Sequence, residues 1–340
     1  MPHGALGAKG QEHLMKAALC KKIGEPEDMV IADIAPPILR EDHLRIRVRA
    51  CALNFPDILT VQGKYQRQPP MPFAPGMECA GDVIEVGPKA KGGFKVGDRV
   101  MAQPGVGCLA EQVCTSPMSV YAIPDNVSYE HAAGFIVTYG TVYHAFVDRG
   151  DLKRGETLLV LGAAGGVGLA AVELGKLMGA KVIAAASNDT KLKVCEQYGA
   201  DHVLNYTHEP IKETVLGLTN EKGADVVFDP VGGDATLQAL RCINRNGRLL
   251  IIGFASGTIA DIPANRLLLR QCQAVGVAFG SYGMAFPEKV RDSMTVLTGW
   301  WGEGKLKPHV SMTFPLDQTV AAMNALVTRK AIGKVVVTIP

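Results

Sequence analysis

Residues Thr157–Asn188 read TLLVLGAAGGVGLAAVELGKLMGAKVIAAASN, and they are the strongest indication of the fold in this chain. This stretch opens with an apolar run typical of a strand, Leu158–Leu161, and continues through a glycine-dense turn, Gly162–Gly168. A helical pattern follows, and then a second apolar run, Lys181–Ala186. This order is the first half of a dinucleotide-binding unit, in which glycines let backbone N–H groups approach a pyrophosphate at a helix N-terminus. We therefore predict a parallel α/β sheet that holds a dinucleotide, with an ordinary surface turn as the alternative.

The residues after the second run indicate which dinucleotide is bound. An NAD-type unit places an acidic residue roughly 20 positions past the turn, to hold the ribose 2′-hydroxyl. Here that place is Ala186, followed by Ser187 and, further on, Lys191. Small polar groups and a lysine suit a 2′-phosphate, so we predict NADPH rather than NADH. Asp189 is expected to satisfy free N–H groups at a helix start.

The composition excludes several classes of protein. The chain has 340 residues, 47% of them apolar, and a net charge of +2. A length near 150 residues per domain allows two domains, and the balanced charge gives no reason to expect nucleic acid or an anionic membrane as a partner. No apolar run approaches the roughly 20 residues of a membrane helix. The eight scattered cysteines suggest a reducing compartment, the cytoplasm or alternatively the mitochondrial matrix.

The pattern of apolar segments and turns changes along the sequence. Residues 1–13 lack the features of a targeting segment and are expected to form a disordered tail or to be a cloning remnant. Short apolar segments between Pro/Gly turns predict a β-rich barrel over residues 14–135. Strands alternating with helices predict a doubly wound sheet over residues 136–271. A closing strand near Lys334–Ile339 suggests that residues 272–340 rejoin the first domain, so that the nucleotide domain is an insertion.

Several segments together resemble the medium-chain dehydrogenase/reductase superfamily, in its zinc-independent quinone oxidoreductase branch. The resemblance runs from about Met15 to Pro340 and implies a Rossmann domain inserted in a GroES-like barrel. The segments that carry it are Ala52–Asp57 (ALNFPD), Gly63-x-Tyr65, Pro75–Glu78 (PGME), Gly97–Val100 (GDRV), Ala163–Gly168 (AAGGVG), Phe228–Gly233 (FDPVGG), Gly253–Gly257 (GFASG) and Gly333–Val336 (GKVV).

The resemblance also shows what this chain lacks. Zinc dehydrogenases of the superfamily carry a catalytic Cys, a Gly-His-Glu and a lobe of four cysteines. Aligned on Asp57 and Glu78, the Cys position is Asn54 and the His position is Met77. An amide and a thioether are poor zinc ligands, so we predict that the protein has no metal site.

Without a metal, the implied chemistry is hydride transfer from NADPH to a quinone or a similar electron-poor carbonyl compound. Tyr65 is the candidate donor to the acceptor oxygen, and a tyrosine that caps the barrel is the alternative. Asn54 is a candidate for binding the substrate or the nicotinamide ribose, and an ordinary turn asparagine is the alternative. His144 lies in a helical pattern and is expected to be packed or solvated.

Further coenzyme contacts are implied by resemblance, position by position. Thr138 is expected at the nicotinamide end, and the pyrophosphate is expected on the turn. Phe254 and Ser256 would lie on the loop past the nicotinamide, and Phe279 and Lys334 are looser candidates. The predicted coenzyme-binding residues are Thr138, Ala164, Gly165, Gly166, Val167, Ser187, Lys191, Tyr206, Phe254, Ser256, Phe279 and Lys334.

Two alternatives to quinone reduction stay open. The related 2-enoyl (thioester or ketone) reductases use a tyrosine at the place of Tyr65 as a proton donor. A crystallin-like protein that binds NADPH with little turnover would share the fold and the coenzyme site. The resemblance also implies a homodimer formed through the nucleotide domain. There, residues 254–270 suggest an apolar strand and an LLLR run, and a core helix would explain that run equally well.

Overall fold

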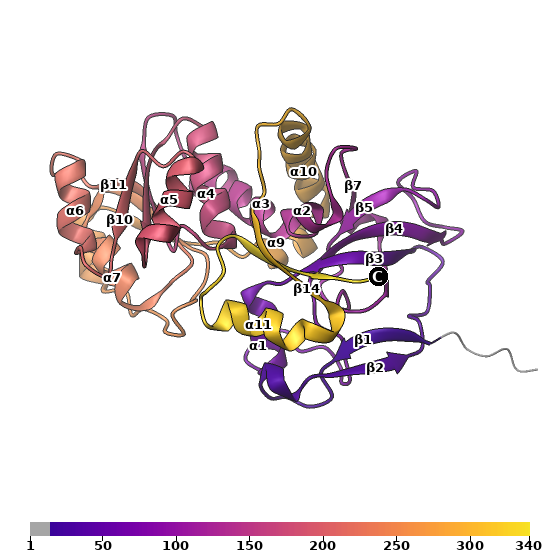
Figure 1. Ribbon diagram of the computed structural model, residues 1–340. Coiled ribbons are helices and arrows are strands. Elements are labelled where there is room, and N and C mark those ends of the chain that lie inside the picture. The colour runs from indigo at the N-terminus through magenta and orange to yellow at the C-terminus, as the bar shows by residue number, and fades with distance from the viewer. Residues whose placement is uncertain (1–13) are drawn as a thin grey trace, which may run out of the picture.

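The computed structural model describes residues 14–340, so the tail expected at residues 1–13 lies outside the described part of the chain. One mixed sheet is built from the N-terminal strands and the last two strands, and one parallel sheet is built from the middle of the chain. In Figure 1 the mixed sheet lies on the right and the parallel sheet on the left, with the yellow C-terminal segment returning to the right. This arrangement confirms the predicted insertion of a doubly wound α/β unit in a β-rich domain.

The mixed sheet runs in the order β14-β15-β3-β4-β5-β7, with β6 paired to β3 and a separate β1–β2 ladder. Its closing strand β15 pairs antiparallel with β3, and this pairing joins the two ends of the chain. The strands are β1 (Met15–Leu19), β2 (Val30–Ile34), β3 (Leu44–Ala52), β4 (Glu78–Val86), β5 (Arg99–Ala102), β6 (Gln112–Thr115), β7 (Val120–Ala122), β14 (Val310–Pro315) and β15 (Lys334–Thr338). The helices of this part are α1 (Phe55–Val61), α2 (Tyr129–Ala133) and α11 (Thr319–Val327), with short 3₁₀ turns at Pro26–Asp28, Pro117–Ser119 and Leu316–Gln318.

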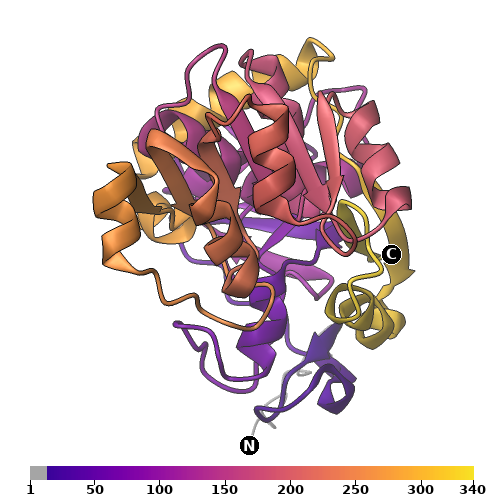
Figure 2. The same ribbon diagram turned by 90° about the vertical axis from the view of Figure 1, so that its left-hand side faces the viewer.

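The parallel sheet has six strands, joined by helices that lie on both of its faces. Figure 1 shows α6 and α7 on one side of this sheet and α4 on the other, and Figure 2 views the sheet from the side at which α6 and α7 lie. The strands are β8 (Thr157–Leu161), β9 (Lys181–Ala186), β10 (His202–Asn205), β11 (Ala224–Asp229), β12 (Ile243–Ile251) and β13 (Gln273–Gly276). The helices are α3 (Phe135–Tyr143), α4 (Gly166–Leu177), α5 (Asp189–Gln197), α6 (Ile211–Leu218), α7 (Gly233–Arg241), α8 (Ala264–Arg270), α9 (Phe279–Ala285) and α10 (Pro287–Gly302), and a π-helical turn spans His144–Arg149.

Strand order places a ligand crevice at one edge of the parallel sheet. The order is β10-β9-β8-β11-β12-β13, so the chain order reverses between β8 and β11. In open α/β sheets of this kind, ligands bind beyond the carboxyl ends of the strands at such a switch point. The glycine turn follows β8 directly, and it therefore lies at that point.

Two sequence expectations differ from the structure in this region. The parallel sheet extends past the predicted boundary at residue 271, because β13 pairs with β12 along Gln273–Gly276. The LLLR run forms α8, yet no residue of α8 is buried, and Leu268 and Leu269 are 76% and 69% exposed. The expectation of a core helix was therefore wrong, and so was that of an apolar strand, since the residues between β12 and α8 form no strand.

Within residues 14–340, no helix is both long and apolar enough to cross a membrane.

Candidate functional site

The glycine turn between β8 and α4 has the backbone geometry of a phosphate cradle. Gly162 has a φ of +58°, which other residues adopt at a cost. A Cβ at Gly168 would lie 2.3 Å from the carbonyl oxygen of Gly162, so only glycine lets α4 approach β8 this closely. In the described chain, the N–H groups of Gly166, Val167 and Gly168 have no hydrogen-bond acceptor. These donors, at the positive end of α4, suit an anion.

The glycine turn is also hydrogen-bonded to Gly333, the residue that precedes the C-terminal strand β15. The N–H of Gly333 donates to the carbonyl oxygen of Ala164 at 2.8 Å, and Gly165 and Gly333 form an isolated parallel bridge. Gly333 has a φ of +66°, and a Cβ there would lie 2.4 Å from the carbonyl oxygen of His309. Strand β15 therefore begins directly beside the phosphate turn.

Two cationic residues lie at the end of β9, where the 2′-phosphate is predicted. Lys191 Nζ donates to the carbonyl oxygen of Arg329 at 2.7 Å, and the guanidinium of Arg329 donates to the carbonyl oxygen of Ala255 at 3.2 Å. Burial, and then the charge of Arg329, lower the pKa of the Lys191 ammonium. Tyr206 adjoins this place, because its N–H donates to Ala186. Sequence reasoning missed Arg329, since it lies 138 residues from Lys191 and no motif marks it.

The helix start after β9 differs in one detail from the expectation. The N-cap of α5 is Asn188, whose Oδ1 accepts from the N–H of Lys191 at 3.0 Å. Asp189 is the first residue of α5, and its carboxylate accepts from Asn205 Nδ2 at 2.7 Å. Asp189 therefore engages the end of β10 and does not cap the helix. Ser187 is half-buried at the same turn.

A buried triad of polar side chains, Asn54, Glu78 and Lys334, lies where the mixed sheet approaches the glycine turn. Lys334 Nζ donates to Asn54 Oδ1 at 2.8 Å and to Glu78 Oε1 at 3.0 Å. Asn54 Nδ2 donates to the same Glu78 oxygen at 3.0 Å. Asn54 is 8% exposed, Glu78 0% and Lys334 6%. The side chain of Asn54 thus has protein partners on both its oxygen and its nitrogen.

The triad reaches the helix that carries Thr138. Glu78 Oε2 accepts from the N–H of Val137 at 2.9 Å, near the start of α3. A Cβ at Gly166 would lie 3.0 Å from Lys334 Cδ and 3.3 Å from Thr138 Cγ2. Thr138 itself is 2% exposed, and its hydroxyl donates to the carbonyl oxygen of Gly134 within the same helical segment. The structure therefore brings together four predicted residues from four separate segments: Asn54, Thr138, Gly166 and Lys334.

Tyr65 lies in the loop after α1, and in the described chain no hydrogen bond joins it to the triad. It is half-buried, and no partner for its hydroxyl is found in residues 14–340. Burial, and then the charge of Asp57, raise the pKa of this hydroxyl, while Arg67 acts in the opposite sense. Burial also raises the pKa of Asp57 to about 7, against the hydrogen bonds that its carboxylate accepts from the N–H groups of Asn54 and Gly76. With its pKa raised, Tyr65 keeps its proton at neutral pH, and its hydroxyl can donate a hydrogen bond.

The remaining candidates occupy different surroundings. Phe254 is 38% exposed on the loop after β12, and Ser256 Oγ hydrogen-bonds within that loop to Thr258. Phe279 is buried against Gly140 of α3, where a Cβ would lie 2.4 Å from its ring. His144 is packed, as expected: it is 4% exposed, stacks on a tyrosine ring and contacts a carboxylate through Nδ1.

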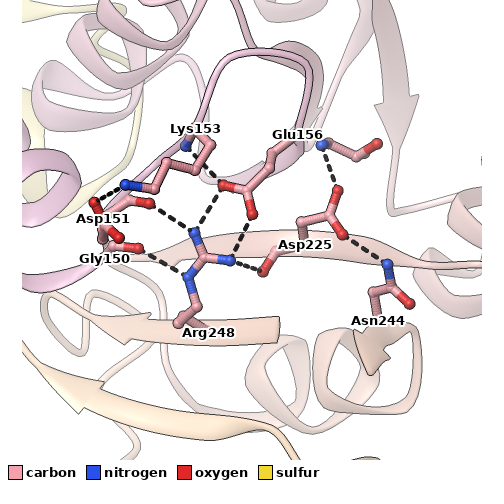
Figure 3. Close-up of polar contacts among 8 residues, drawn as sticks. Gly150, Asp151, Lys153, Glu156, Asp225, Asn244 and Arg248 are labelled. Carbon is pink, nitrogen blue, oxygen red and sulfur yellow. Dashed lines mark hydrogen bonds and ion pairs between the residues drawn. The ribbon is translucent and has the colours of Figure 1, made fainter. Parts of the chain in front are cut away.

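A second polar cluster lies at the opposite, amino ends of the strands (Figure 3). Arg248 binds both oxygens of Glu156 at 2.7 Å, and its Nε donates to the carbonyl oxygen of Gly150 at 2.8 Å. Beside it, Asp225 accepts from Asn244 Nδ2 at 2.6 Å. A cavity of about 290 Å³ adjoins Arg248. Because Arg248 already has protein partners along its whole guanidinium, we interpret this cluster as a structural clamp.

Comparison with known proteins agrees with this geometry. Residues 40–147 match the family model of the alcohol dehydrogenase GroES-like domain, and residues 166–297 match that of the zinc-binding dehydrogenases. The quinone oxidoreductase-like protein 2 homolog of Nematostella vectensis is 40% identical over 326 residues, covering 95% of this chain and 88% of that protein. The chain belongs to the medium-chain dehydrogenase/reductase superfamily, in its quinone oxidoreductase branch.

Other members of this branch are similar over the same length. Quinone oxidoreductase-like protein 2 of Bos taurus is 39% identical over 95% of this chain and 92% of its own length. The crystal structure of Escherichia coli quinone oxidoreductase complexed with NADPH superposes with a TM-score of 0.88 at 27% identity, covering 96% of this chain and 99% of that one.

Proposed function

We propose that this protein is an NADPH-dependent, metal-free oxidoreductase that reduces a quinone or a similar electron-poor carbonyl compound. The observation that carries the proposal is the Lys334 ammonium, 2.8 Å from the side-chain oxygen of Asn54. The ammonium already occupies the oxygens of Asn54 and Glu78, at the position where zinc relatives place a ligand, so neither oxygen is free to bind a metal ion. NADPH itself supplies the hydride when it is bound.

Coenzyme binding would use residues from both parts of the protein, the α/β unit and the C-terminal segment of the β-rich domain. The glycine turn offers N–H groups to the pyrophosphate, and Lys191 and Arg329 offer charge to the 2′-phosphate. Escherichia coli quinone oxidoreductase, which was solved with NADPH, supports this choice of coenzyme. We expect Lys191→Ala to weaken NADPH binding by about 1.5–3 kcal/mol, the typical contribution of a charged hydrogen bond, and to leave NADH nearly unaffected. Equal losses for both coenzymes would contradict the role of Lys191.

The acceptor would be oriented by the loop after α1. The half-buried Tyr65 hydroxyl keeps its proton at neutral pH and can donate a hydrogen bond to the acceptor oxygen as charge develops there. The same hydroxyl favours a second candidate, a 2-enoyl reductase, in which Tyr65 would transfer its proton to the product.

One acceptor panel tests these possibilities. We would measure NADPH oxidation with 9,10-phenanthrenequinone and with crotonyl-CoA, in the wild type and in Tyr65→Phe. Quinone turnover in the wild type that is reduced but not abolished in Tyr65→Phe supports the quinone reductase with Tyr65 as a hydrogen-bond donor, whereas loss of most enoyl turnover in that variant supports the enoyl reductase with Tyr65 as acid. Unchanged rates with both acceptors would remove Tyr65 from the mechanism. Tight NADPH binding without turnover of any acceptor would contradict both and favour the crystallin-like role.

We further propose that the protein is a homodimer formed through the nucleotide domain. Strand β13 is the edge of the parallel sheet, and the neighbouring α8 exposes Leu268 and Leu269. An open strand edge beside exposed leucines suits pairing with a second copy. Sedimentation velocity should give a dimer for the wild type and a monomer for Leu268→Glu/Leu269→Glu. A dimer that persists in the double variant would place the interface elsewhere.

A further inference from the structure

Asn205 is the last residue of β10, and it lies beside the last residue of β9 in the sheet register, Ala186. It is 5% exposed, although it adjoins the surface where the 2′-phosphate is proposed to bind. Its Nδ2 donates to Asp189 Oδ1 at 2.7 Å. A buried amide thus holds an exposed carboxylate at the adenosine end of the crevice.

The orientation of this amide is determined by its other partners. Asn205 Oδ1 accepts from Thr207 Oγ1 at 2.6 Å and from the N–H of Thr207 at 3.2 Å. Because Oδ1 faces two donors, Nδ2 must face the carboxylate of Asp189. The main-chain N–H of Asn205 points to Glu209 Oε1 at 3.4 Å. The side chain of Asn205 has therefore one orientation, and that orientation binds Asp189.

The charges around this place have opposite effects on the two coenzymes. Lys191 and Arg329 lie on one side and favour a 2′-phosphate. Asp189 lies three residues after Ala186, the position at which NAD-type units use a carboxylate to bind the ribose 2′-hydroxyl. A carboxylate free to turn toward the ribose would repel the phosphate of NADPH and accept a hydrogen bond from the hydroxyl of NADH.

We propose that Asn205 is a specificity-determining residue, which sets the preference for NADPH by holding the Asp189 carboxylate against β10. The proposal rests on the NADPH preference proposed above. Its role is positioning, since Asn205 acts on the coenzyme through Asp189.

The test measures dissociation constants of NADPH and NADH by isothermal titration calorimetry, with no acceptor present. In Asn205→Leu, the affinity ratio of NADPH to NADH should fall about fivefold, because the released carboxylate and the 2′-phosphate repel each other in a largely aqueous surrounding. In Asn205→Leu/Asp189→Asn the wild-type ratio should return, because the released side chain no longer carries a charge. Asp189→Asn alone should change the ratio less than about twofold, since Asn205 already holds the carboxylate.

The chain offers a matched control at the other end of the sheet. Asn244 Nδ2 donates to Asp225 Oδ1 at 2.6 Å, an equivalent contact remote from the crevice (Figure 3). Asn244→Leu should lower stability and leave the coenzyme ratio unchanged.

Three outcomes would overturn the proposal. A wild-type ratio near one removes the proposed NADPH preference and, with it, the role of Asn205. A wild-type preference for NADPH that Asn205→Leu leaves unchanged overturns the role of Asn205 alone. A lowered ratio that persists in Asn205→Leu/Asp189→Asn would mean that the variant acts by displacing Tyr206, and the carboxylate would then have no part.

Discussion

Replacing Lys334, the buried cation of the triad, tests how much its ion pair with Glu78 stabilises the folded protein. In Lys334→Met the aliphatic stem can still pack on Gly166, but Glu78 loses its counter-charge while it remains fully buried. At 3.0 Å and an effective dielectric constant of about 20, the attraction between the two charges is about 5.5 kcal/mol. Breaking a buried pair by removing one partner typically costs about 3–5 kcal/mol, and we expect Lys334→Met to lower the free energy of unfolding by this amount.

Urea unfolding followed by circular dichroism measures this change. A second substitution, Glu78→Gln in the Lys334→Met background, should recover about half of the loss, because it removes the uncompensated charge. Lys305→Met is the matched control: its ion pair with Glu303 is about half exposed, and we expect a change below about 1 kcal/mol. A loss below about 1 kcal/mol in Lys334→Met, or no recovery in the double variant, would refute the view that the pair is electrostatically coupled in the interior.

Three further predictions concern other parts of the molecule. Gly168→Ala places a Cβ 2.3 Å from the Gly162 oxygen, and it should weaken NADPH binding at least about tenfold by calorimetry. Gly217→Ala has open space around it in α6, and as the control it should instead raise the free energy of unfolding by about 0.5–1 kcal/mol. Because the folded-state pKa of Asp57 is raised from 3.8 to about 7, the folded protein binds a proton that the unfolded chain releases, and stability should fall as the pH rises through this window. Asp57→Asn should abolish that slope in urea midpoints from pH 5 to 8, and an unchanged slope would assign it to other groups. In Arg248→Lys the bidentate contact with the Glu156 carboxylate is lost, so the free energy of unfolding should fall by about 2–3 kcal/mol without a change in coenzyme affinity.

Local patterns predicted most of the parallel sheet. Continuous apolar runs locate β8 and β9, because strands buried on both faces need apolar side chains at every position. The pattern was misleading at α8, where an apolar run predicts burial but the leucines face outward. Periodicity reports which residues are apolar, and it does not report whether a chain covers them.

The class of site could be predicted from the sequence, because a glycine turn after an apolar strand allows close approach of the backbone to a phosphate. The absence of a metal site remains a prediction from Asn54 and Met77. The hydrogen-bond partners of the site residues could be found only in the folded chain. Lys334 meets Asn54 across 280 positions, Arg329 meets Lys191 across 138, and Asn205 turns Asp189 away from the helix end it was expected to cap. A turn is specified by residues that are neighbours in the chain, so its pattern is visible in the sequence. Charged side chains that are distant in the chain come into contact only after the sheets have packed and excluded water.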